Sequence, residues 1–80
     1  MTQADDRILE TLESSGLKLS PRILSVNIDY SRHYVSRRLN KLQEAGLVDK
    51  VDDGLYQITQ KGSDYLSGSL DADDLQLDDD

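Results

Sequence analysis

Polar and basic side chains that can donate hydrogen bonds gather in the middle of the chain, between Tyr30 and Leu47. At 100° per residue, a helix over this stretch places Val35, Leu39 and Leu42 on one apolar side and the polar residues on the other. Such donors on one face can bind phosphates and base edges. These residues therefore indicate nucleic-acid binding, with an ordinary solvated helix face as the alternative. The polar side carries His33, Ser36, Arg37, Asn40 and Lys41.

Two residues set the ends of the helix that must hold this face. Ser31 can act as the N-cap, because its hydroxyl can accept from a backbone N–H of the first turn. Gly46 can end the helix in the left-handed conformation, which costs glycine little. We therefore predict one helix between Ser31 and Gly46.

Composition excludes several kinds of site. The chain has no Cys and one His, so a disulfide framework, a thiolate zinc site and a histidine metal cluster are excluded. It has no Gly-rich phosphate loop and no apolar run long enough to cross a membrane. We expect a cytoplasmic protein that is not an enzyme and has no catalytic residues, metal, cofactor, membrane partner or evident small-molecule ligand.

The net charge of −7 is unevenly distributed. Residues 18–50 contain seven Lys and Arg against three Asp and Glu, whereas residues 71–80 contain six Asp. A positive centre between acidic ends fits an electrostatic footprint on one face of the molecule. The acidic remainder is typical of proteins from salt-rich cytoplasms, although it could equally serve solubility alone.

Two shorter helices are predicted before the basic one. Thr2 and Asp5 resemble a capping signal for a helix over about residues 4–15. Ser20-Pro21 starts a helix over about residues 21–27, whose buried side we assign to Ile23, Leu24 and Ile28. Asp29 tolerates the left-handed backbone of a tight turn, so this helix and the basic one form a helix-turn-helix pattern. Residues 17–19 alternate as a short strand or a connector.

After Gly46 the hydrophobic period changes to two. Residues 47–51 and 55–58 read as strands joined by Asp52-Asp53-Gly54, a strong hairpin signal. Thr59 then caps a helix from residue 60 to about 68, in which Gly62 indicates close approach to a neighbouring backbone. The predicted fold is mainly α with a small β-hairpin (α+β): a winged helix-turn-helix with a three-helix core, a wing and a short C-terminal helix. The domain spans residues 1–70, and the acidic tail, residues 71–80, is expected to be disordered.

Over about residues 4–70 the sequence resembles small winged-helix regulators of haloarchaea. The resemblance is to the repressor of a haloarchaeal phage and, more distantly, to the MarR and ArsR types. It implies a transcriptional regulator of halophilic archaea that binds double-stranded DNA, usually as a homodimer. The matching residues are Tyr30-Ser31-Arg32, Tyr34-Val35-Ser36-Arg37-Arg38-Leu39, Leu42, Gly46-Leu47-Val48, Gly54-Leu55-Tyr56, Ile58-Thr59, Lys61-Gly62 and Tyr65-Leu66.

In a winged helix of this kind, the N-terminal half of the basic helix enters the major groove. Arg32, His33, Ser36 and Arg37 are expected nearest the bases, and Arg37 is the first choice for a bidentate contact to guanine. The other candidates contact the DNA backbone: Ser31, Asn40, Lys41, Arg22, Lys18, Lys50 at the base of the wing, and Arg38, for which an intramolecular partner is an equal alternative.

One departure from the pattern concerns the wing. Many winged helices carry Arg at the wing tip, whereas this tip is Asp52-Asp53-Gly54. Carboxylates repel phosphates, so the wing should read the minor groove poorly and the basic helix should carry recognition. The function predicted is sequence-specific DNA binding and transcriptional repression. The alternative is a winged-helix protein-interaction module for a basic partner, without DNA binding.

Overall fold

The computed structural model describes residues 2–52 and 54–68, which form a three-helix core, a two-stranded antiparallel hairpin and a fourth helix. This arrangement confirms the predicted α+β winged helix-turn-helix. Asp53 at the wing tip and the acidic tail predicted over residues 71–80 lie outside the described residues. The elements are α1 (Gln3–Ser15), α2 (Pro21–Ile28), α3 (Arg32–Glu44), β1 (Val48–Val51), β2 (Leu55–Ile58) and α4 (Gln60–Leu66).

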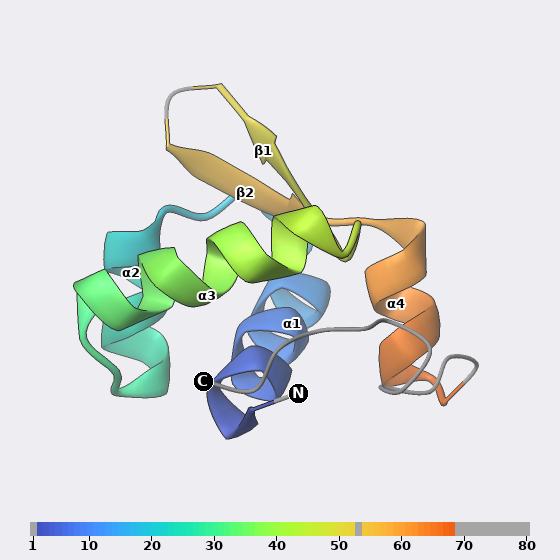
Figure 1. Ribbon diagram of the computed structural model, residues 1–80, viewed down its shortest axis with the longest axis horizontal. Coiled ribbons are helices and arrows are strands. Elements are labelled where there is room, and N and C mark those ends of the chain that lie inside the picture. Colours follow the sequence, from blue (N-terminus) through green and yellow to red (C-terminus); the bar gives the residue numbers. More distant parts are fainter. Residues whose placement is uncertain (1, 53, 69–80) are drawn as a thin grey trace.

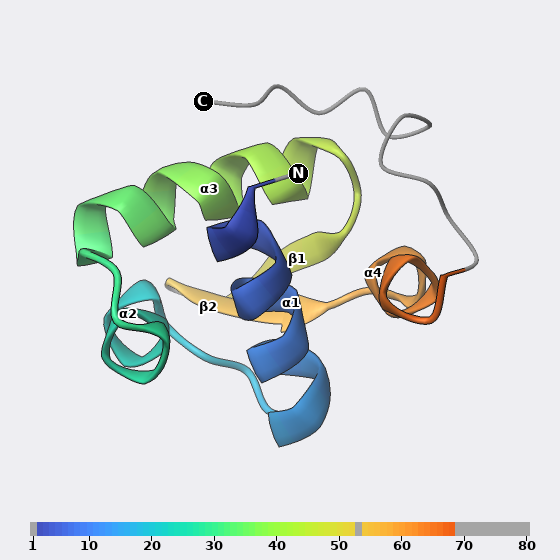
Figure 2. The same cartoon turned by 90° about the horizontal axis from the view of Figure 1, so that it is seen from below.

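The helices surround one core, from which the hairpin projects. In Figure 2, α1 lies between α2 and α4, and α3 runs along one side of this layer. The hairpin β1–β2 stands beyond α3 at one end of the molecule (Figure 1). The core is built from apolar residues of every element except α4, with residues of α4 packed against it. Its buried members are Ile8, Leu9, Leu12, Leu19, Leu24, Ile28, Val35, Leu39, Leu42, Leu47, Val48 and Tyr56.

The predicted helix starts are confirmed by the cap geometry. The Thr2 hydroxyl accepts from the Asp5 backbone N–H at 3.2 Å, and the Asp5 carboxylate accepts from the Thr2 N–H at 3.0 Å, which completes a capping box. Ser20 caps α2 ahead of Pro21, and Ser31 caps α3. These caps supply acceptors for first-turn N–H groups that have no partner within their helices.

The turn of the helix-turn-helix also follows the prediction. Asp29 adopts the left-handed conformation (φ 63°) directly after α2, and α3 begins three residues later at Arg32. The prediction was wrong for Ile23, which is 46% exposed, because the buried face of α2 narrows to Leu24 and Ile28.

A third segment pairs with the hairpin through one isolated β-bridge. Leu19 and Tyr56 exchange backbone hydrogen bonds of 2.9 and 2.8 Å, so residues 17–19 act as both connector and strand. Leu47 does not join β1 as predicted, because its N–H donates to Leu42 O at the end of α3; its carbonyl still accepts from the Thr59 N–H, which is opposite it in the register of the hairpin.

Gly62 confirms the close approach inferred from its position. A Cβ built on Gly62 would overlap the Leu47 carbonyl oxygen and stand 2.6 Å from Ile58 Cγ1. Thr59 holds this junction together, since its hydroxyl donates to Gly46 O at 2.6 Å and accepts from Gly62 N–H at 3.1 Å. The start of α4 is thereby fixed to the end of α3.

Candidate nucleic-acid interface

The helix α3 has two unlike faces, as its sequence predicts. Val35, Leu39 and Leu42 are buried and turn toward the rest of the core. Between Ser31 and Gln43 the helix carries no carboxylate. We call the residues on the opposite side the outer face of α3; Arg32, His33, Arg37 and Asn40 are exposed, and Ser36 and Lys41 are half-buried.

Ser31 has a structural role as the N-cap of α3. Its hydroxyl accepts from the Tyr34 N–H at 3.1 Å, and this fixes the first turn of α3. Tyr30 and Tyr34 stack beside it with ring centroids 5.7 Å apart. The side chain of Ser31 remains exposed at the helix start, where backbone N–H groups and the positive end of the dipole favour anions.

Arg38 corrects the predicted set of DNA contacts. Its side chain is wholly buried, and its guanidinium forms two hydrogen bonds to the wholly buried carboxylate of Asp5 on α1. A side chain that water does not reach cannot contact a phosphate on the surface. The alternative role of Arg38, as partner of an acid within the chain, is therefore the one that the structure shows.

The remaining predicted cations come from other elements. Arg22 lies exposed in the first turn of α2, where the sequence placed it. Lys18 is exposed directly before the Leu19–Tyr56 bridge, so that bridge holds Lys18 beside the wing. Lys50 is exposed but is the third residue of β1, which puts it nearer the wing tip than the predicted base. Asp52, also exposed, adds a negative charge near Lys50 at that end of the wing.

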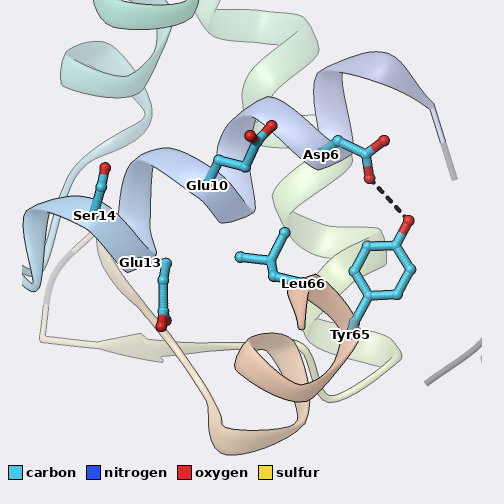
Figure 3. A pocket seen from close by; sticks show the side chains of 6 residues that line it. All are labelled: Asp6, Glu10, Glu13, Ser14, Tyr65 and Leu66. Carbon is cyan, nitrogen blue, oxygen red and sulfur yellow. Dashed lines mark hydrogen bonds between the residues drawn. The ribbon is translucent and has the colours of Figure 1, made fainter. Parts of the chain in front are cut away.

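A second surface feature lies between α1 and α4 (Figure 3). We call it the acidic groove; it is shallow and combines three carboxylates with two α4 side chains. The Tyr65 hydroxyl donates to Asp6 Oδ1 at 2.9 Å across the groove. Its negative charge makes it unsuitable for a phosphate backbone. The lining residues are Asp6, Glu10, Glu13, Ser14, Tyr65 and Leu66.

Two kinds of feature are absent from residues 2–52 and 54–68. No group of three or more His, Cys, Asp or Glu side chains there could hold a metal ion. None of the helices in these ranges has the length and apolar character needed to cross a bilayer.

Comparisons with known proteins agree with this geometry. The family model described as winged helix-turn-helix phage repressor matches residues 1–78. The crystal structure of the PhiH1 repressor-like protein from Haloarcula marismortui is similar to this chain, with 41% sequence identity and a TM-score of 0.78. The match covers 85% of this chain and 78% of that one. No curated protein matches the sequence.

The family model spans nearly the whole chain, including the helix-turn-helix and the wing. The family is one of DNA-binding regulators, not of enzymes. On these grounds the chain belongs to the winged helix-turn-helix phage repressor family.

Proposed function

We propose that this protein binds specific sites on double-stranded DNA through the outer face of α3 and represses transcription there. The observation that carries the proposal is the charge of this face. Arg32, Arg37 and Lys41 lie on it, whereas the chain as a whole has a net charge of −7. Such segregation is typical of a DNA-binding footprint.

The dimensions of α3 suit the major groove. Its 13 residues extend about 20 Å at 1.5 Å per residue, and the groove of B-DNA admits one helix. In this pose Arg32, His33, Ser36 and Arg37 approach base edges, with Arg37 bidentate to a guanine. Ser31, Asn40 and Lys41 then meet the backbone of the duplex.

The exposed cations outside α3 complete the proposed interface. Arg22 at the start of α2 and Lys18 beside the wing would contact phosphates, since the first helix of a helix-turn-helix crosses the backbone. Lys50 would add a contact from the wing. Because the tip also carries Asp52, the wing contributes little to base reading.

We further propose a homodimer, as the resemblance to the haloarchaeal phage repressor implies. A two-fold dimer places two copies of α3 on half-sites about one helical turn apart. Similarity to the Haloarcula protein also supports a cytoplasm rich in potassium chloride as the working environment.

Selection of bound DNA from a random duplex pool at high potassium chloride tests the proposal. We expect one enriched sequence with related half-sites. Against that sequence, Arg37→Ala should cost roughly 1–3 kcal/mol of binding free energy and relax one base position. Arg7→Ala removes the same charge from an exposed position on α1 and should change the affinity less than twofold. No enrichment, or unchanged binding by Arg37→Ala, would contradict the proposal.

A protein-interaction module is the second candidate, and the acidic groove is the observation that favours it. Three carboxylates around Tyr65 and Leu66 suit a basic partner. This function predicts that the pool yields no enriched DNA and that a basic protein co-purifies with the chain.

A further inference from the structure

The Asp5–Arg38 ion pair joins the first helix to the helix proposed to read DNA. Arg38 Nε donates to Asp5 Oδ1 at 2.8 Å, and Arg38 Nη2 donates to Asp5 Oδ2 at 2.7 Å. Asp5 Oδ2 also accepts from the Thr2 N–H, so the same carboxylate closes the capping box of α1. Both side chains have no exposed surface.

Stability alone does not account for such a pair. Two charges taken out of water lose their hydration, and well-packed apolar residues of similar volume often stabilise a fold equally well or better. Both helices also contribute apolar residues to the same core, among them Ile8 of α1 and Val35 of α3. What the ion pair adds is directionality, because two parallel hydrogen bonds between planar groups fix their relative orientation.

The orientation of α3 matters for the side chains on its outer face. Arg37, on that face, precedes Arg38 by one residue and lies 100° from it around the helix. Side-chain atoms there lie about 5–6 Å from the helix axis, so a 10° rotation of α3 displaces them by about 1 Å. A bidentate contact to guanine requires donor–acceptor distances within a few tenths of an ångström of 2.9 Å. A small rotation of α3 would therefore spoil base recognition while leaving phosphate attraction nearly unchanged.

We propose that the Asp5–Arg38 ion pair is a positioning element for DNA recognition: it fixes the rotation of α3 against α1, so that the outer face meets base edges in one pose. Arg38 and Asp5 touch no DNA and act through Arg37 and its neighbours. This inference rests on the proposed function, since it specifies how the same surface gains sequence specificity.

The test compares selected with scrambled DNA. In Asp5→Asn/Arg38→Met both charges are removed, and the Asn oxygen keeps an acceptor for the Thr2 N–H. We expect affinity for the selected sequence to fall about tenfold or more, with affinity for scrambled DNA within twofold of wild type. A merely structural role would reduce the folded fraction and weaken both DNAs equally. A folded double variant with the wild-type specificity ratio overturns the proposal.

A milder variant keeps the positive charge at position 38 and removes the two parallel donors of the guanidinium. Arg38→Lys places a single ammonium group opposite Asp5, without the planar pair of donors. The specificity ratio should fall several-fold, between wild type and the double variant. An unchanged ratio in this variant also overturns the proposal.

A measurement on the wild-type chain needs no substitution. The Arg38 Nε proton should exchange slowly with solvent, both alone and with the selected DNA, because the ion pair is buried in both states. Rapid exchange would show that the pair does not hold α3 in solution, and the proposal would fall.

The outcomes distinguish failure of this inference from failure of the proposed DNA-binding function. If the wild type enriches no DNA, both fail. If the wild type is specific and Arg37→Ala relaxes one base position, yet either folded ion-pair variant keeps the wild-type ratio, only the positioning role fails.

Discussion

The two faces of α3 carry adjacent arginines with opposite surroundings. Arg37 lies exposed on the outer face, whereas Arg38 is buried to 0% exposure beside Asp5. One step of 100° along a helix separates a side chain that can meet a ligand from one that belongs to the core. The comparison teaches that not every basic residue of a basic helix contacts DNA, because the face on which a residue lies decides its role.

The first way to break this comparison is to remove each arginine in turn. Arg38→Met leaves the Asp5 carboxylate buried without its partner, and this should lower the free energy of unfolding by roughly 3–5 kcal/mol. Arg37→Met changes an exposed side chain and should cost less than about 1 kcal/mol. Denaturant unfolding at high potassium chloride measures both.

Equal losses for the two variants would contradict the assignment of the faces. The same outcome would also remove the reason for excluding Arg38 from the DNA contacts. A large loss for Arg38→Met alone supports burial of the ion pair in solution.

The second test compares two serines on the same helix. Ser31→Ala removes the acceptor that holds the Tyr34 N–H and should cost about 1 kcal/mol of unfolding free energy. Ser36→Ala lies within the helix, where alanine is the better helix former, and should stabilise by a few tenths of a kcal/mol. Thermal unfolding of the two variants side by side should give shifts of opposite sign. An unchanged or raised unfolding temperature for Ser31→Ala would mean that Ser31 does not cap α3.

Most of the fold was predictable because its signals are local. The capping residues Thr2, Ser20 and Ser31, the left-handed Asp29 and the close-packed Gly62 each depend on a few neighbours along the chain. Tertiary packing decided the exceptions. Ile23 is exposed because the core reaches only one side of α2, and Leu47 stays outside β1 because its N–H bonds to Leu42 O of α3.

The sequence left an intramolecular partner for Arg38 as an equal alternative, but it did not identify Asp5 as that partner. Asp5 precedes Ile8, Leu9 and Leu12 by three, four and seven residues, so it lies on the apolar stripe of α1. Arg38 likewise stands between Val35 and Leu42 on the stripe of α3. Opposite charges on two apolar stripes that must pack together are a signal for a buried pair. Which residues touch across the two helices, however, depends on their crossing geometry, which one sequence does not specify.

The last comparison separates phosphate contacts from base contacts on the outer face. Lys41→Gln removes one charge and leaves a polar side chain that is one atom shorter, so the slope of log affinity against log salt should become about 0.9 less steep. If the two proteins bind equally well at 1 M salt, Lys41→Gln should therefore bind roughly eightfold more weakly than wild type at 0.1 M.

At molar salt the screening length is about 3 Å, so Lys41→Gln and wild type should bind the selected DNA within twofold of each other. Arg37→Ala should keep its loss at every salt concentration, because hydrogen bonds to base edges do not depend on counterion release. Titrations by fluorescence anisotropy across this range measure both slopes. If Lys41→Gln altered base preference, or if the effect of Arg37→Ala vanished at molar salt, the division of the outer face into base-reading and phosphate-binding residues would have to be reversed.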